Sequence, residues 1–252
     1  MQPRPSVLKI QKVFAGRGLQ PRPKRLKIRK VQFMPVPIIS CLGILIFLLF
    51  TVGNVVSAAN TYKRMYLLDV VPLLTVPPPN PTGKTLLVSI PKAAPGFDTP
   101  ALLYICDNSR NKKCGKSNRY ELKAYANSQW IDTPARMLLP LMVHHLEATG
   151  LFGAVLSAAT SPVVGELRLD TEIIRLLQEF KTYPSQVRLI LRVQLLDMVA
   201  RQVVATRVFE VVENTRSENA EGGMEATNLA VTRLLKKLVT FLEKQIKEFP
   251  PK

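Results

Sequence analysis

The clearest pattern in the chain is the alternation of apolar and polar residues in its second half. Within Gln186 to Val199 apolar side chains stand at every second position, and the alternation repeats from Gln202 to Glu213. Successive side chains of a β-strand point to opposite faces, so each run predicts a strand with one buried face. Only Ala200 and Arg201 separate the two runs, which predicts a β-hairpin.

Shorter apolar runs predict further strands nearer the N-terminus. Thr85 to Ile90 is β-branched and apolar, is bounded by prolines, and predicts a buried strand. Ala101 to Cys106 and Arg119 to Ala126 predict the two strands of a hairpin, with the polar loop CDNSRNKKC at its tip. Leu151 to Ser157 predicts one more short strand.

Two segments show the three- and four-residue spacing of apolar side chains that is typical of helices. The first begins with Thr133 as its cap and Pro134 at the first helical position, and Gly150 marks its end. The second runs from about Gly223 to Lys247 and has one apolar face. Its expected buried residues are Leu229, Leu234, Leu238, Leu242 and Ile246.

The segment from Gly165 to Phe180 fits two patterns. Leu167, Leu169, Thr171 and Ile173 alternate as in a strand, whereas Ile173, Leu176, Leu177 and Phe180 have helical spacing. Periodicity alone leaves both possibilities open. Several strands with two amphipathic helices predict an α+β domain in which helices pack on a sheet.

The N-terminal quarter of the chain has the pattern of an export segment. Residues 1–36 hold ten Lys or Arg and no acid, and the 19 mostly apolar residues from Ile38 to Val56 follow them. Such a run is close to the roughly 20 residues that cross a bilayer as a helix, and a basic flank stays in the cytoplasm. We therefore expect a basic cytoplasmic leader over 1–36, a transmembrane or signal segment over 37–59, and export of the rest.

The positive charge of the chain is therefore interpreted as a signal of membrane topology and not of a ligand. The formal net charge is +17, and the most basic stretch, PRPKRLKIRK from Pro21 to Lys30, has no aromatic residues among its cations. Interleaved aromatics would be expected of a nucleic-acid surface, so no specific nucleic-acid partner is predicted.

Three kinds of anchor are compatible with this segment. Cys41 stands in a local lipobox-like context, but cleavage there would leave most of the apolar run on the mature protein. The small residues Ser57 to Ala59 suit a signal cleavage site, which would release a soluble periplasmic domain. The run is longer than a usual removable core, so we favour an uncleaved inner-membrane helix with the domain in the periplasm.

Five prolines between Pro72 and Pro81 predict an extended linker over 60–83, with the folded domain over 84–248. The linker would let the domain reach partners away from the bilayer. In an oxidising compartment Cys106 and Cys114, with seven residues between them, are expected to form a disulfide.

The sequence holds no recognisable set of catalytic residues. Gly83, Lys84 and Thr85 resemble the end of a phosphate-binding loop, but Pro78 occupies the place of its first glycine. The two histidines, His144 and His145, are adjacent and have no partner at ligand spacing. We therefore expect no enzymatic activity, no cofactor and no metal site.

The candidates for partner or substrate contact are Tyr125, Trp130 and Arg136, which lie around the start of the first helix. A single tryptophan at such a place presents a binding surface or, more commonly, packs into the core.

Four segments of the chain resemble one known family. They are residues 120–150 (YELKAYANSQWIDTPARMLLPLMVHHLEATG), LRLDTEIIRLLQEF, VRLILRVQLLDMVARQVVATRVFEVVE and GGMEATNLAVTRLL. This sequence resembles the auxiliary lipoprotein component of ABC-type transporters, which accompanies lipid transport systems with mammalian-cell-entry (MCE) domains. The resemblance runs from Met65 to Phe241, and Trp130 to Leu138 is its most specific part.

The resemblance implies a non-enzymatic periplasmic subunit that works beside an MCE-domain protein, a permease and a cytoplasmic ATPase in moving lipids or other hydrophobic substrates. It favours a strand for Leu167 to Phe180, in a curved, mainly antiparallel sheet with two principal helices on one face. Lipid, and further copies of the same chain in a homo-oligomer, are the other partners that we expect. The alternative is an envelope scaffold or assembly protein that does not contact substrate.

The chain departs from the family pattern at two places. The cysteine hairpin is an insertion, and Cys41 precedes the bulk of the apolar run, where relatives carry their lipid-modified cysteine after it.

Overall fold

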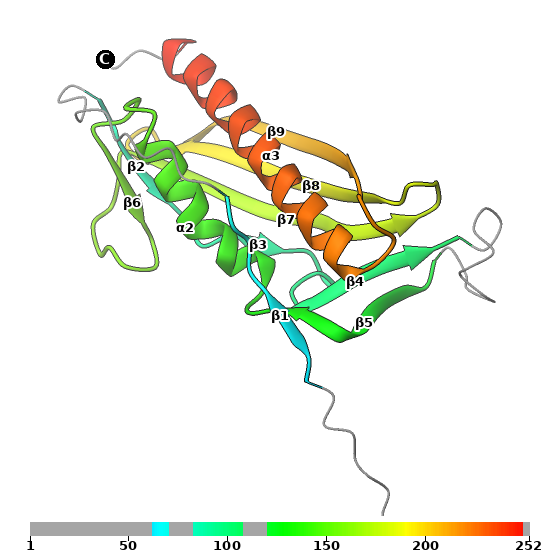
Figure 1. Ribbon diagram of the computed structural model, residues 1–252. Helices are drawn as coiled ribbons and strands as arrows, with labels where there is room; N and C mark the ends of the chain where they lie inside the picture. The colour runs from blue at the N-terminus through cyan, green and yellow to red at the C-terminus, as the bar shows by residue number, and fades with distance from the viewer. Residues whose placement is uncertain (1–61, 71–82, 108–119, 249–252) are drawn as a thin grey trace, which may run out of the picture. The chain divides into compact units, whose positions relative to one another are not determined.

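A nine-stranded sheet with two helices makes up the computed structural model, which describes residues 62–70, 83–107 and 120–248 (Figure 1). In chain order the strands are β1 (Arg64–Tyr66), β2 (Thr85–Val88), β3 (Lys92–Ala93), β4 (Ala101–Cys106), β5 (Leu122–Trp130), β6 (Ala154–Ser157), β7 (Leu167–Phe180), β8 (Gln186–Asp197) and β9 (Gln202–Asn214). The helices are α2 (Pro134–Glu147) and α3 (Ala220–Glu248). The expected α+β class and every strand expected from the alternating and apolar runs are confirmed.

The three long strands β7, β8 and β9 form an antiparallel unit in which each strand pairs along nearly its whole length. Their alternate side chains, among them Leu169, Leu189, Leu191 and Val211, are buried, as the sequence pattern predicts. The β8–β9 turn is held by Asp197, whose Oδ1 accepts the backbone N–H groups of Val199 and Ala200 at 2.9 and 2.8 Å.

The ambiguous segment is strand β7, and a bulge explains why it fitted two patterns. The pairing register with β8 shifts between Ile173 and Arg175. One extra residue changes which face the following side chains occupy. Ile173 and Leu176 are therefore both buried, and their three-residue spacing imitates a helix turn.

The short strands β2, β3 and β4 pair in succession along the other edge of β7, all in parallel. β6 pairs in parallel with β2, and β1 with β5, whereas β4 and β5 form the predicted antiparallel hairpin. The expectation of a mainly antiparallel sheet therefore holds for the long strands, and the sheet as a whole is mixed. Side-chain alternation carries no information on strand direction, so the sequence did not reveal the parallel pairs.

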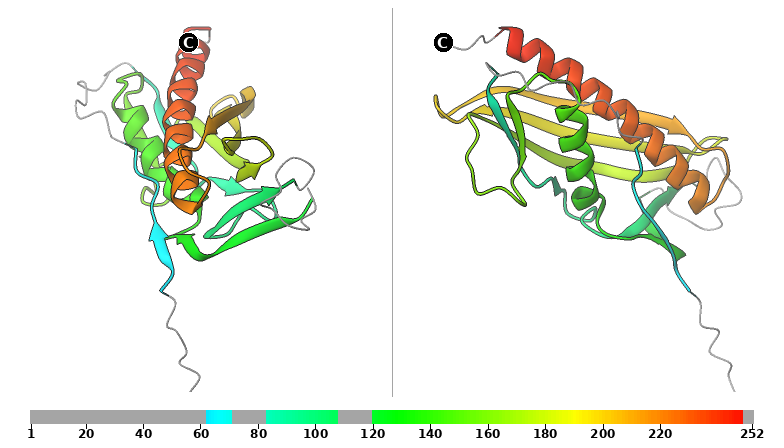
Figure 2. Two further views of the ribbon diagram at one scale, coloured as in Figure 1. Left: turned by 45° about the vertical axis from the view of Figure 1, so that its right-hand side comes forward. Right: turned by 60° about the vertical axis from the view of Figure 1, so that its left-hand side comes forward.

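Both helices cover one face of the sheet, as expected (Figure 2). α3 buries a stripe that includes Ala226, Ala230, Leu234, Leu238 and Leu242. The predicted burial of Leu229 is wrong, since its side chain is 46% exposed. Successive helical residues lie about 100° apart, and the small Ala226 and Ala230 place the contact stripe beside Leu229 instead of on it.

The folded domain begins earlier than the expected boundary at residue 84. Arg64–Tyr66 is strand β1, in register with Ser128 to Trp130 of β5, and Leu68 and Val70 are buried. Figures 1 and 2 show the chain after β1 running between α2 and α3, where the Asp69 N–H donates to Asn228 Oδ1. The proline-rich stretch therefore follows the first strand, and the expected linker over 60–83 is corrected to this extent.

Three expectations fall outside the described residues: the basic leader, the membrane or signal segment over 37–59, and Cys114 of the predicted disulfide. Among the residues that are described, no helix is both long and apolar enough to cross a membrane.

Candidate functional site

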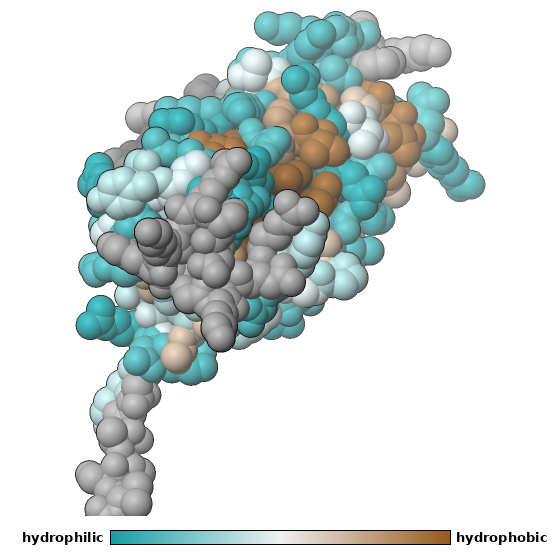
Figure 3. Space-filling model, turned by 90° about the vertical axis from the view of Figure 1, so that its right-hand side faces the viewer, coloured by the Kyte–Doolittle hydropathy of each residue, from teal (hydrophilic) through white to brown (hydrophobic). Residues whose placement is uncertain are grey.

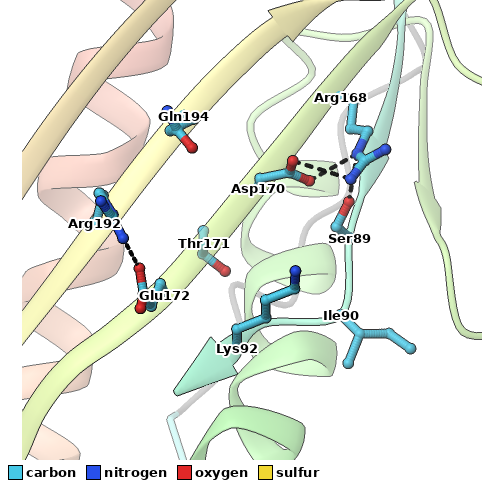
Figure 4. Close-up of a pocket in the computed structure, with 9 residues that line it drawn as sticks. All are labelled: Ser89, Ile90, Lys92, Arg168, Asp170, Thr171, Glu172, Arg192 and Gln194. Carbon is cyan, nitrogen blue, oxygen red and sulfur yellow. Dashed lines mark hydrogen bonds and ion pairs between the residues drawn. The ribbon is translucent and has the colours of Figure 1, made fainter. Parts of the chain in front are cut away.

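A cavity lined by charged side chains opens where the chain leaves the edge of β7 between β2 and β3. It has a volume of about 340 Å³. On the β2 side of the cavity Ser89 N–H still donates to Leu169 O, and on the β3 side Lys92 pairs in register with Glu172. We call this cavity the charged hollow, and its lining residues are Ser89, Ile90, Lys92, Arg168, Asp170, Thr171, Glu172, Arg192 and Gln194 (Figure 4).

Two ion pairs neutralise most of the charge in the hollow. Arg168 donates from Nε and Nη2 to the two carboxylate oxygens of Asp170, at 2.7 and 3.0 Å, and Nε also contacts Ser89 Oγ at 3.0 Å. Arg192 pairs with Glu172 across β7 and β8. Two arginines and two carboxylates cancel, so the hollow keeps the positive charge of Lys92.

Lys92 has no ion-pair partner within the described part of the chain, since Glu172 beside it is bound to Arg192. An exposed ammonium group on a flexible stem suits a carboxylate or phosphate oxygen. The charged lining is unfavourable for an acyl chain, because burying it would remove water from the ion pairs.

The three predicted contact residues do not form one surface. Trp130 is 2% exposed and belongs to the hydrophobic core, so its interpretation as a contact residue is wrong and core packing is confirmed. Arg136 is exposed in the first turn of α2, with its Nη1 3.8 Å from Asp132 Oδ1. Tyr125 is half-buried and shares with Trp130 the lining of a cavity of only about 10 Å³.

Tyr125 takes part in a buried polar network that the sequence did not reveal. Its hydroxyl donates to Gln178 Oε1 at 2.9 Å, and Gln178 Nε2 donates to Ser185 Oγ at 2.8 Å. Ser185 Oγ lies 2.7 Å from Thr215 Oγ1. Burial, and then the charges of Tyr104 and Glu218, raise the pKa of Tyr125 well above its usual range. The phenol therefore stays neutral and acts as a hydrogen-bond donor to Gln178.

The network connects β5, β7, the start of β8 and the segment before α3, which indicates a structural role. Gln178 stands beside Glu179 in a strand where polar and apolar residues are equally common, so no signal in the sequence distinguishes it.

The remaining candidates for chemistry lie apart from the hollow. His144 is exposed on α2, 3.4 Å from Glu147, and His145 is half-buried. Burial and then Lys236 lower the pKa of His145. The described residues contain no cluster of His, Cys, Asp and Glu that could hold a metal ion.

No protein-family model matches the sequence, and no curated protein matches it. Among solved structures, protein XCC0632 of Xanthomonas campestris, of the DUF330 family, superposes with a TM-score of 0.57 at 22% identity, over 73% of this chain and 97% of that one. An uncharacterized protein superposes with a TM-score of 0.54 at 10% identity, over 72% of this chain and 99% of that one. These likenesses show that the domain shares its fold with a DUF330 protein.

Proposed function

We propose that the protein is a non-enzymatic auxiliary subunit of an MCE-type ABC transporter in the bacterial cell envelope. It assists the movement of lipids or other hydrophobic substrates by binding partner subunits. The resemblance of four ordered sequence segments supports this assignment. The likeness in fold to a DUF330 protein of a bacterium is compatible with it.

The observation that carries the mode of action is the charged hollow. It opens between strands of the sheet, its lining carries five charged side chains, and one cation in it is unpaired among the described residues. Such a site favours docking of an acidic or polar group of a partner over enclosure of an acyl chain. We therefore propose that the subunit acts through its surface and leaves lipid conduction to its partners.

The apolar run over 38–56 supports an inner-membrane tether with the domain in the periplasm. Because β1 begins at Arg64, ahead of the prolines, the tether holds the domain near the bilayer instead of far from it.

Affinity capture of the full chain from native membranes in mild detergent tests this function. We expect mass spectrometry to recover an MCE-domain protein or a permease subunit with the wild type. Lys92→Glu should recover at least about threefold less, since it reverses the unpaired charge of the hollow. Lys247→Glu, at an exposed position in the last turn of α3, is the matched control and should recover as much as the wild type.

Capture of neither subunit by the wild type would contradict the proposed function. Capture that is unaffected by Lys92→Glu would contradict docking at the charged hollow alone.

A further inference from the structure

One corner of the domain carries exposed apolar side chains next to basic ones. Tyr62, Met65, Leu67 and Ile131 are each more than half exposed. We call these four residues the β1 surface. Figure 1 shows β1 at the lower end of the domain, next to β5 and the first turn of α2.

Strand pairing brings three of these side chains together, those of Met65, Leu67 and Ile131. Tyr66 is in register with Trp130, and the Ile131 N–H donates to Tyr66 O at 2.7 Å. Met65 and Leu67 alternate with the half-buried Tyr66 and the buried Leu68, so they point away from the core. Ile131 therefore lies directly beside β1 and extends its apolar surface.

Basic side chains flank the β1 surface. Lys63 and Arg64 are exposed in the same segment. Arg136 is exposed nearby, with its Nη1 3.8 Å from Asp132 Oδ1. Aromatic, basic and apolar side chains in one place are the composition of segments that lie at a membrane interface.

The apolar run of the sequence ends a few residues before this corner along the chain. Val56 is six residues before Tyr62, and an extended chain covers at most about 3.5 Å per residue, or roughly 20 Å in all. The proline-rich stretch comes after β1 and adds nothing to this reach. If residues 38–56 are in the bilayer, Tyr62 lies within about 20 Å of its surface.

We propose that the β1 surface rests on the bilayer, with Tyr62, Met65, Leu67 and Ile131 among the lipid head groups and the nearby cations on anionic lipid. This inference depends on the tether of the proposed function, and adds a second, non-covalent membrane contact made by the folded domain itself. That contact fixes which face the domain turns to the membrane and which it leaves open to partners.

Fluorescence quenching by brominated lipid tests the inference on the full chain in vesicles of phosphatidylglycerol and phosphatidylcholine. Met65→Trp places a probe on the β1 surface, and Val199→Trp places one in the exposed β8–β9 turn. The right-hand view of Figure 2 shows this turn at the opposite end of the sheet from β1. The buried Trp130 gives the same background in both variants.

We expect the Met65→Trp probe to be quenched at least about threefold more than the Val199→Trp probe. Adding Lys63→Glu and Arg64→Glu to Met65→Trp should reduce the quenching at least about twofold in anionic vesicles. It should leave the far-ultraviolet circular dichroism unchanged, because both side chains are exposed.

Equal quenching of the two probes, or none at position 65, in chains that float with the vesicles would overturn the inference and leave the proposed function standing. Chains that do not float with the vesicles would contradict the tether and this inference together. Capture of partner subunits, described above, tests the proposed function separately.

Discussion

Gln178, a polar residue in the core, restricts which residues fit at the positions around it. Its side-chain amide is held between the Tyr125 hydroxyl and Ser185 Oγ. A Cβ on Gly223 would lie 2.3 Å from Gln178 Oε1, which is far closer than van der Waals contact. A side chain at this position near the start of α3 would therefore displace the Gln178 amide from its hydrogen bonds, although the helical backbone itself would accept other residues.

Gly223→Ala should lower the free energy of unfolding by about 1–3 kcal/mol, because the displaced amide loses buried hydrogen bonds. Denaturant unfolding measures this change. Glu221→Ala, at an exposed position in the same turn, is the control and should change stability by no more than about 0.5 kcal/mol. If the clash is the cause, adding Gln178→Ala to Gly223→Ala will cost less than the sum of the two single changes.

His145 is expected to make stability depend on pH. Its pKa in the folded state is lowered from 6.5, first by burial and then by Lys236. The unfolded chain therefore binds a proton at a higher pH than the folded one, and the stability present above about pH 6.5 is lost as the pH falls through the folded pKa.

Replacing His145 by Gln should flatten the decline in unfolding free energy between about pH 7 and about pH 5. His144→Gln is the matched control, since the neighbouring side chain is exposed on the same helix. Denaturant titrations at several pH values give both slopes. An identical slope for wild type and His145→Gln would contradict the assigned role.

At the level of elements, the sequence predicted which segments are strands and helices, and it predicted less well how the strands pair. Alternation located β8 and β9, and capping residues located α2. The bulge in β7 and the parallel partners of its edge depend on contacts between distant segments, which no local pattern records. β1 was missed because three residues beside a proline-rich stretch are too few to show a period.

The adjacent residues Leu67 and Leu68 test whether the segment after β1 belongs to the folded domain. Leu68 is buried and Leu67 is exposed. Leu68→Ala should lower the free energy of unfolding by about 2–4 kcal/mol, because it removes buried apolar volume. Leu67→Ala should change it by no more than about 0.5 kcal/mol. Equal, small effects in thermal or denaturant unfolding would show that the segment behaves as a linker.

For the whole molecule, the candidate site is the part that the sequence predicted least well. Trp130 is in the core, Tyr125 serves the buried network, and only Arg136 is exposed. The charged hollow joins residues 89–92 with β7 and β8, and these segments meet only through the parallel pairing that alternation cannot show. From the side that Figure 3 shows, apolar groups lie among hydrophilic ones.

The position of β1 also affects how far from the membrane the domain stands in the proposed function. The prolines were expected to carry the domain away from the membrane, but they follow the first strand of the sheet. A domain held close to the bilayer would meet the membrane-embedded parts of a transporter directly, with the charged hollow available for docking.

Site-specific photo-cross-linking in intact cells tests the central claim most directly. A photoactivatable residue at Gln194, in the charged hollow, is compared with one at Thr240, on the exposed side of α3. We expect an adduct between position 194 and an MCE-domain protein or a permease subunit, with little or none from position 240. Failure of position 194 to cross-link to either subunit, or equal yields from both positions, would contradict it.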